Sequence, residues 1–149
     1  MNTASKDITP ILGVLRKRSE FLYVRDGFYS AKGGVVVQMR KNEARKFDGM
    51  PRIGMGFTAT KKIGNAVVRN RAKRRLREVA RVVLPEHGLP GYDYVLIARS
   101  STTAREWTDL LDDTRKALIT LSKRAAAMTG KTNKNAQNPK SQKNKSRSA

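Results

Sequence analysis

Two spacings of apolar residues divide the centre of this 149-residue chain. Between residues 52 and 60, apolar side chains alternate with glycine or threonine, which is typical of a strand with one buried face. Between Ala66 and Leu84 the spacing lengthens to three or four residues, as in a helix that buries one stripe. The stripe consists of Val68, Ala72, Leu76, Val79 and Val83. The pattern therefore predicts a strand followed by an amphipathic helix, which Pro85 should end.

A short helix and a β-branched run precede this strand. Ser19 is a candidate N-cap for the helix, and Asp26-Gly27 is its candidate end. Residues 28–40 predict a strand with a kink at Gly33-Gly34. Because a polar, turn-like segment at 41–51 leads from this strand to the next one, we expect the two to pair antiparallel.

A further strand and a last helix follow. Tyr92 to Ala98 is rich in strand-forming residues, and Thr103 with Glu106 has the sequence signature of a capping box. The helix after this box has its own apolar stripe, and Gly130 closes it. We expect the stripe to face the core through Trp107, Leu111, Thr114, Leu118, Leu121, Ala125 and Met128.

The order helix, strand, strand, helix, strand, helix favours an α+β fold. We predict a two-layer sandwich with a small sheet, in which the third strand enters through a split βαβ-type crossover. An irregular segment at 1–14 precedes a single domain at 15–128. The segment 129–149 is rich in Lys, Asn, Gln and Ser, has no acid, and is expected to be disordered. Such a tail either attracts polyanions or only aids solubility.

The charge of the chain indicates a class of partner. There are 32 Lys and Arg against 12 Asp and Glu, which gives a formal net charge of +20 and a pI of about 11.0. This excess indicates a polyanion, with nucleic acid favoured over a membrane surface. The absence of Cys and the single His exclude disulfides, cysteine-based zinc sites and two-histidine motifs. No apolar run is long enough to span a membrane, and the lack of Cys fits a cytoplasmic location.

Much of this charge falls in one basic segment, residues 61–77. It holds eight basic residues and no acidic one, and most of it lies on the predicted helix. Like charges four residues apart destabilise an isolated helix, so their density here indicates that the helix binds a polyanion. Gly64 and the candidate N-cap Asn65 precede free N–H groups that favour an anion. Charge alone fits both DNA and RNA.

The run K-K-I-G-N-A-V-V-R-N-R-A-K-R-R-L-R resembles the Arg-Asn-Arg signature of the bacterial ribonuclease P protein subunit. The strands on either side are placed as in that family, over roughly residues 15–128. The resemblance implies a basic protein that assists a catalytic RNA, which removes the 5′ leader of precursor tRNA by Mg²⁺-dependent hydrolysis. It implies no catalytic residue and no cofactor on the protein itself. By matching position, the RNA-subunit contacts would be Lys61, Lys62, Asn65, Arg69, Asn70, Arg71, Lys73 and Arg74.

The family also has a cleft between its first helix and the sheet, where the single-stranded leader binds. Phe21 matches an aromatic residue of that cleft. Val35, Val37 and Phe57 lie on strands that could line the cleft or form plain core. A second cleft aromatic of some members falls at Arg25, whose guanidinium could bind a phosphate instead. The resemblance therefore implies two RNA partners, the ribonuclease P RNA and precursor tRNA.

No set of side chains in the sequence combines a nucleophile, a base and a charge stabiliser. Asp109, Asp112 and Asp113 are predicted to lie on a solvated helix face, His87 in a loop, and Trp107 in the core. Two other functions stay open on the residues alone. A structural RNA-binding protein of ribosomal type would share the charge, whereas a nuclease acting alone would need a carboxylate cluster to hold its metal.

Overall fold

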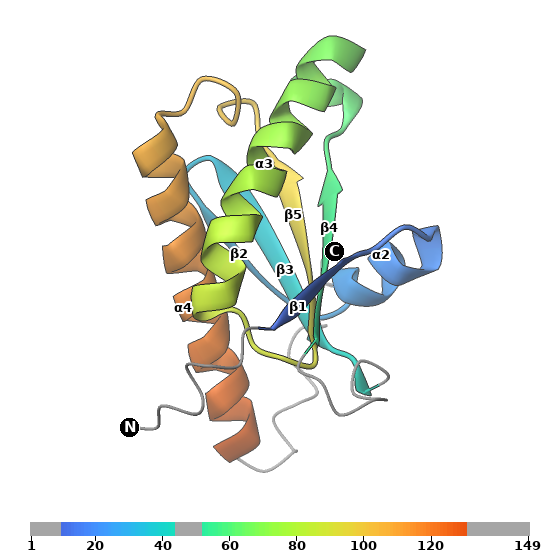
Figure 1. Cartoon of the computed structure of the whole chain (residues 1–149), viewed down its shortest axis with the longest axis vertical. Helices are drawn as coiled ribbons and strands as arrows, with labels where there is room; N and C mark the ends of the chain where they lie inside the picture. Colours follow the sequence, from blue (N-terminus) through green and yellow to red (C-terminus); the bar gives the residue numbers. More distant parts are fainter. Residues whose placement is uncertain (1–9, 44–51, 131–149) are drawn as a thin grey trace, which may run out of the picture.

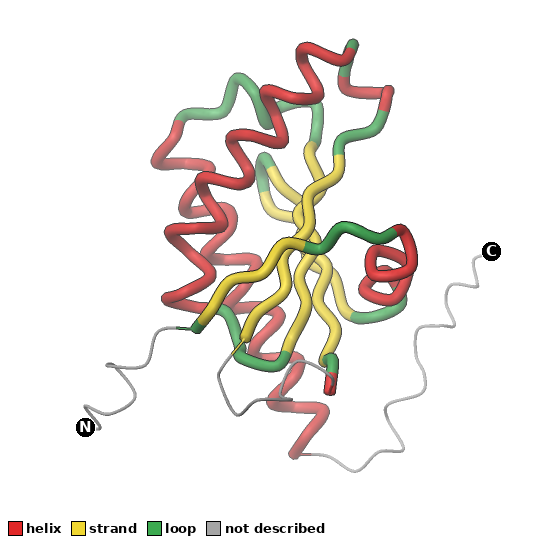
Figure 2. The backbone as a smooth tube through the Cα atoms, turned by 45° about the vertical axis from the view of Figure 1, so that its right-hand side comes forward, coloured by secondary structure: helices red, strands yellow, loops and turns green. Residues whose placement is uncertain are grey.

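The computed structural model describes residues 10–43 and 52–130, and it has the predicted α+β class. In chain order, its elements are β1 (Ile11–Val14), α2 (Arg18–Arg25), β2 (Phe28–Lys32), β3 (Val35–Lys41), β4 (Arg52–Thr58), the 3₁₀ helix η2 (Lys61–Ile63), α3 (Ala66–His87), β5 (Tyr92–Ala98) and α4 (Trp107–Gly130). Figure 1 shows α3 and α4 side by side on one face of the five-stranded sheet. The short helix α2 lies against the other face (Figure 2). In this described part, no helix is both long and apolar enough to cross a lipid bilayer.

The order of the strands differs from the predicted one. It is β1-β4-β5-β3-β2, so β5 separates β3 from β4. β5 is parallel to β4 and antiparallel to β3. The prediction that the strands at 28–40 and 52–60 pair with each other is therefore wrong. Because α3 returns the chain to the end of the sheet where β4 begins, β5 can run parallel to β4, as the predicted βαβ crossover requires.

The N-terminal half contains two strands that were not predicted. One arises because residues 28–40 are divided between two strands, and the other precedes α2. Residues 28–40 form most of a two-stranded hairpin rather than one kinked strand, because Gly33 and Gly34 make a tight turn. Gly33 has a φ of +47°, which glycine adopts without steric cost. Residues 11–14, predicted to be irregular, form β1 and pair parallel with β4. Leu12 holds this edge strand in place by packing against the core.

The main core lies between the sheet and the helices α3 and α4. The predicted stripe of α3 is buried from Ala72 to Val83. On the other side of the sheet, a smaller cluster joins Leu15, Val24 and Val95. Because both of its faces are covered, β4 is buried throughout 53–57 rather than on one face only.

Both long helices depart from their predicted ends. α3 continues through Pro85 to His87, because a proline in the last turn removes a single N–H donor and the turn still closes onto Gly88. α4 begins at Trp107, so Thr103 lies in the preceding turn and is not its cap. Hydrogen bonds from Arg75 to backbone carbonyls hold that turn.

Two side chains of α4 lie opposite to their predicted positions. Trp107 was expected in the core and is 39% exposed, whereas Asp113 was expected in solvent and is only 7% exposed. The buried face of α4 is rotated from the predicted stripe, because Leu110 and Ala117 are also part of it. Asp113 lies beside them and is charge-paired there, which makes its burial tolerable.

Candidate nucleic-acid interface

The basic segment leaves β4 and turns sharply into α3. η2 exposes Lys61 and Lys62, and Gly64 has a φ of +146°, a backbone conformation that favours glycine. Asn65 is the N-cap, as predicted, and its side-chain oxygen accepts the N–H of Val68 at 3.0 Å. Two lysines are therefore close in sequence to the positive end of the helix dipole.

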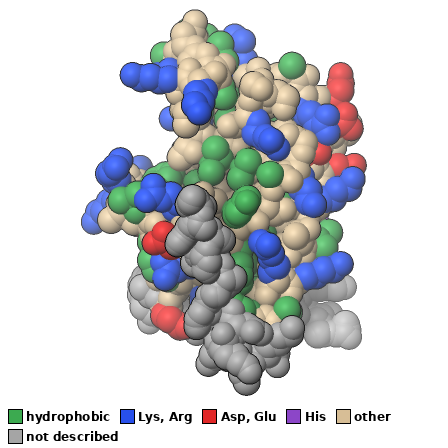
Figure 3. All heavy atoms as spheres, turned by 180° about the vertical axis from the view of Figure 1, so that it is seen from behind, with side chains coloured by type: hydrophobic (Ala, Val, Ile, Leu, Met, Phe, Trp, Pro, Cys, Tyr) green, Lys and Arg blue, Asp and Glu red, His purple; other side chains and the backbone are tan. Residues whose placement is uncertain are grey.

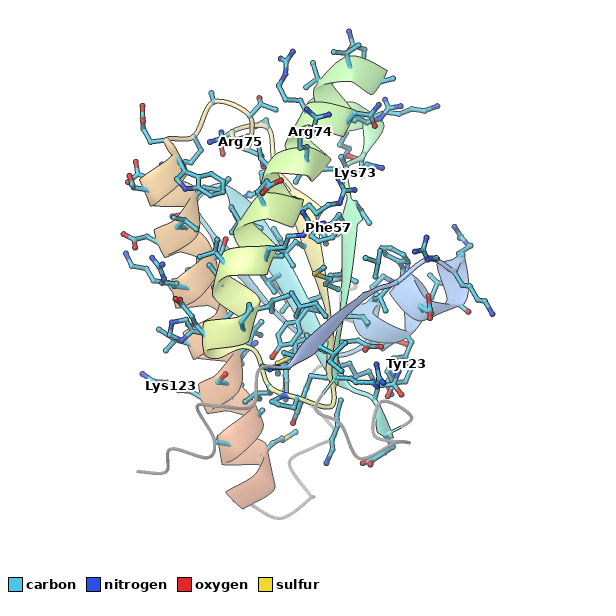
Figure 4. All side chains as sticks on the ribbon, viewed as in Figure 1. Tyr23, Phe57, Lys73, Arg74, Arg75 and Lys123 are labelled. Carbon is cyan, nitrogen blue, oxygen red and sulfur yellow. The ribbon has the colours of Figure 1, made fainter. Side chains whose placement is uncertain are left out.

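The predicted RNA-subunit contacts lie at one end of the molecule. Asn70, Arg71 and Arg74 are exposed on α3, and Arg69 and Lys73 are half-buried on its flank. The first turns of α3 extend past the end of the sheet (Figure 1). Figure 4 shows Lys73 and Arg74 on the upper half of α3, near the end of β4. We call the full set the α3 surface: Lys61, Lys62, Asn65, Arg69, Asn70, Arg71, Lys73 and Arg74.

Several arginines of the basic segment also make contacts within the protein. Arg69 donates from Nη1 to the carbonyl of Gly64 at 3.0 Å, which ties the helix to the turn before it. The Arg77 guanidinium lies 5.5 Å from the centre of the Phe57 ring. Arg75 is the most extensively bonded, because its Nη1 donates to three backbone carbonyls of the turn before α4. These belong to Thr102 at 2.9 Å, Thr103 at 2.9 Å and Arg105 at 2.7 Å.

The buried carboxylate of Asp113 binds Arg105, which belongs to the same turn. Arg105 donates to both oxygens of Asp113, at 2.8 and 3.0 Å, and Asp113 accepts the N–H of Gly34 at 2.8 Å. Burial acts to raise the pKa of Asp113, but the hydrogen bonds from Arg105 and Gly34 and nearby positive charge outweigh it and lower the pKa. The Thr102 hydroxyl donates to the carbonyl of Gly34 at 2.7 Å. We call Gly34, Arg75, Thr102, Arg105 and Asp113 the turn network, which joins α3, α4 and the β2–β3 turn.

On the opposite side of the sheet, α2 carries the predicted leader aromatic. Its N-cap is Lys17 rather than Ser19, because the Glu20 carboxylate accepts two backbone N–H groups just before the helix, at 2.7 and 2.9 Å. Phe21 then lies directly over Gly56. A Cβ added to Gly56 would come within 2.7 Å of the Phe21 ring. The lack of a side chain at Gly56 therefore leaves room for the ring.

The pairing of the strands places Gly56 at one end of a row of residues that runs across the sheet. Gly56 is paired with Val95, Val95 with Gln38, and Gln38 with Tyr29. Phe21 covers one end of the row, and Tyr29, which is 61% exposed, forms the other. Strands lie about 4.8 Å apart, so the row is roughly 14 Å long. With the accessible residues of the next row, it makes what we call the open face: Phe21, Tyr29, Ala31, Val36, Gln38, Thr58 and Ile97.

Cations surround this apolar face. Figure 3 views the molecule from this side and shows hydrophobic side chains near the centre with Lys and Arg around them. Arg25 is exposed in the last turn of α2. Arg40 lies 4.1 Å above the Tyr23 ring and donates to the Tyr23 carbonyl at 3.0 Å. The Tyr23 hydroxyl donates to the carbonyl of Lys41, so the end of α2 is fastened to β3.

Three predicted leader residues do not belong to the open face. Val35 and Val37 are fully buried and Phe57 is 9% exposed, and all three pack in the core beneath α3 and α4. Successive side chains of a strand point to opposite faces, so of the two predicted alternatives, the cleft beside α2 and the plain core, these three residues have the second. Val36 and Gln38 alternate with Val35 and Val37 and face α2, and neither was predicted as a leader residue. The alternation was visible in the sequence, but it does not say which face lies under which helix.

The acidic residues of the described part of the chain do not gather into a metal site. Within residues 10–43 and 52–130, no group of three or more His, Cys, Asp or Glu side chains is arranged to hold a metal ion. Asp112 lies 3.6 Å from Arg115, and Asp113 pairs with Arg105. His87, predicted to be in a loop, ends α3 and lies 3.9 Å from Glu86.

Comparison with known proteins gives one consistent family. The family model described as Ribonuclease P matches residues 12–122. The chain is 55% identical over 108 residues to the ribonuclease P protein component of Caulobacter vibrioides, covering 72% of this chain and 70% of that one. For the component from Ruegeria pomeroyi the identity is 56%, over 72% and 84% of the two chains.

Solved structures agree with the sequence relatives. The RNase P protein of Staphylococcus aureus is similar with a TM-score of 0.59 and 25% identity, over 72% of this chain and 94% of that one. The RNase P protein of Thermotoga maritima gives a TM-score of 0.52 and 30% identity, over 74% and 94%.

Proposed function

This chain belongs to the bacterial ribonuclease P protein family, and from that premise we propose how its two exposed surfaces divide the work of binding RNA. It is the protein subunit of ribonuclease P, the endoribonuclease that processes tRNA. The alternatives of a ribosomal-type structural protein and of a nuclease acting alone are thereby set aside. What remains to be proposed is which residues meet which RNA.

The α3 surface binds the RNA subunit. The observation that carries this assignment is the projecting start of α3, where eight cationic or amide side chains are exposed or half-exposed and no acid lies among them. Arginine and lysine at a helix start bind phosphates by charge-assisted hydrogen bonds. Asn65 and Asn70 can add hydrogen bonds to phosphate, 2′-hydroxyl or base. The capped, glycine-preceded turn presents these groups in a defined geometry.

The open face holds the single-stranded leader of precursor tRNA. Phe21 and Tyr29 offer aromatic rings for base stacking, and Val36 and Ile97 provide an apolar floor between them. Arg25 and Arg40 lie beside the face and would neutralise leader phosphates. Arg25 keeps the phosphate role predicted for it, while Val35, Val37 and Phe57 are left out of this surface because they are core.

The hydrolysis is assigned to the RNA subunit. The protein neutralises phosphate charge and holds the leader, which helps to position precursor tRNA and Mg²⁺ in the site of the RNA. Mg²⁺ supplies Lewis-acid activation of the attacking water within that RNA site. We place this work in the cytoplasm, where the chain meets newly made precursor tRNA, and we assign no cofactor to the protein itself.

Reconstitution tests the proposal. The full chain, mixed with its ribonuclease P RNA and precursor tRNA at low Mg²⁺, should restore cleavage at the mature 5′ end. The double variant Arg71→Gln with Arg74→Gln should lose most of that stimulation, while Lys123→Gln should retain it. Lys123 is an exposed cation on α4, away from the α3 surface (Figure 4). Full stimulation by the double variant would contradict the assignment of the α3 surface.

A further inference from the structure

Arg75 differs from the exposed cations of α3 in what its guanidinium binds. It lies between Arg74 and Leu76 in sequence, within the basic segment, yet it is half-buried. A single nitrogen, Nη1, donates to the carbonyls of Thr102, Thr103 and Arg105 within 2.9 Å. Figure 4 shows Arg75 on the side of α3 nearest the loop that leads into α4, and Lys73 on the opposite side. A phosphate would therefore compete with three carbonyls for Nη1.

The three carbonyls belong to a turn that is itself fixed. Arg105 is held by Asp113 of α4, and Thr102 and Asp113 both bond to Gly34 in the β2–β3 turn. Hydrogen bonds to a charged donor are among the stronger ones in proteins. Arg75 therefore connects α3 to a junction of three other segments, one turn after Ala72, the first fully buried residue of the helix.

The turns of α3 before Ala72 contain no fully buried residue, so apolar packing does less there to fix the rotation of the helix about its own axis. Arg71 precedes Arg75 by one turn and Arg74 is its neighbour, so a small rotation at Arg75 would redirect both. We propose that Arg75 is a positioning residue of ribonuclease P: it makes no contact with RNA, and it sets the rotation of α3 that aims Arg71 and Arg74 at the RNA subunit. This inference rests on the proposed binding of the RNA subunit by the α3 surface.

Salt dependence separates positioning from direct contact. Each phosphate contact that is lost lowers the slope of log affinity against log salt by about one unit. Arg75→Gln should weaken binding of the full chain to its ribonuclease P RNA by about tenfold, because the RNA must restore the rotation of α3 that the lost bonds no longer fix. The slope should stay unchanged, because Arg71 and Arg74 still reach their phosphates in the complex. Arg74→Gln, the matched variant, should weaken binding and also lower the slope by about one. Lys123→Gln controls for net charge.

A second variant, Asp113→Asn, changes the same contacts between α3, α4 and the turns. It raises the net charge of the protein by one, whereas Arg75→Gln lowers it by one. The substitution removes the ion pair between Asp113 and Arg105, and so weakens the turn whose carbonyls accept hydrogen bonds from Arg75. Net charge alone predicts unchanged or tighter RNA binding, whereas positioning predicts weaker binding. All affinities are measured at a temperature where circular dichroism shows the variants to be fully folded, so that lost stability does not count as lost affinity. If Arg75→Gln does not fold, the direction of the Asp113→Asn effect decides.

The outcomes are distinct. A slope lowered by about one in Arg75→Gln would show a phosphate contact and overturn the inference. Unchanged affinity in a folded Arg75→Gln, or tighter binding by Asp113→Asn, would also overturn it. If Arg71→Gln and Arg74→Gln leave affinity and slope unchanged as well, the α3 surface is not the RNA-subunit site, and the proposed function fails together with this inference.

Discussion

Single aromatic side chains on the open face differ in how firmly the fold holds them. Phe21 is packed over Gly56, whereas Tyr29 leaves 61% of its surface in solvent on the edge strand β2. Base stacking is sequence-tolerant and contributes about 1–3 kcal/mol per base. Tyr29 can therefore lose its ring without disturbing the core, which makes it the cleaner probe of leader binding.

We expect Tyr29→Ala to weaken binding of precursor tRNA with a long leader by about tenfold, because one base loses its stacking partner. Tyr29→Phe should bind normally, since the ring is retained. Binding of mature tRNA should be the same for both variants. A precursor with a leader of a single nucleotide should also be insensitive, because it is too short to cross the face from Phe21 to Tyr29. Equal losses for all these RNAs would contradict stacking at Tyr29.

Asp113 gives a pH dependence to stability. Its pKa is lowered in the folded chain, so its contribution is fully present above its ordinary pKa of about 4 and is lost as pH falls through the lowered value. Asp113→Asn should therefore be less stable than the unchanged protein at pH 7, and the difference should shrink towards pH 3. Urea unfolding at the two pH values measures this. Asp109→Asn, on the exposed side of the same helix, is the matched control.

At the scale of elements, the β2–β3 turn shows how backbone conformation and packing act together. Gly33 has a positive φ, and a Cβ there would lie 2.3 Å from a carboxylate oxygen of Asp113. Gly33→Ala should therefore lower the free energy of unfolding by about 1–3 kcal/mol. Gly13→Ala in β1 is the control, because no atom lies within 4 Å of its added Cβ. Thermal denaturation of both variants compares them, and similar melting temperatures would contradict the role of the turn.

The elements that the sequence predicted best are those whose type and position follow from one local pattern of residues. The stripe of α3, the strand Tyr92–Ala98 and the cap at Asn65 follow from side-chain spacing and local hydrogen bonding. The partners of each strand do not follow from such patterns, because pairing depends on segments far apart in sequence. For that reason the place of β5 between β3 and β4 was missed.

The same limit explains the errors at the site. The α3 surface was found because its residues are consecutive and lie on one helix. The open face draws on α2 and four strands, and a choice of the wrong face exchanges Val36 and Gln38 for Val35 and Val37. The inward position of Arg75 was also missed, since its partners are backbone carbonyls about 30 residues away in sequence. No pattern of side chains marks those carbonyls.

On the scale of the whole molecule, β5 is the element that both halves of the sheet share. It pairs with β3 on one side and β4 on the other, and four of its residues are buried in succession. We expect the amides of β5 to exchange with solvent most slowly of all strands, at the rate of global unfolding. Hydrogen exchange measured residue by residue tests this. Faster exchange in β5 than in the β2–β3 hairpin would show that the two halves unfold separately.

The central place of β5 also bears on when a growing chain becomes competent. The ribosome releases α3 before β5, because the chain emerges from its N-terminus. Until residue 98 is free, the strands can form only two separate pairs, β1 with β4 and β2 with β3. The cationic helix start is thus exposed early, whereas the sheet that supports it is completed late. A nascent chain can attract RNA by charge before it can discriminate among RNAs, and the last strand of the sheet marks the change.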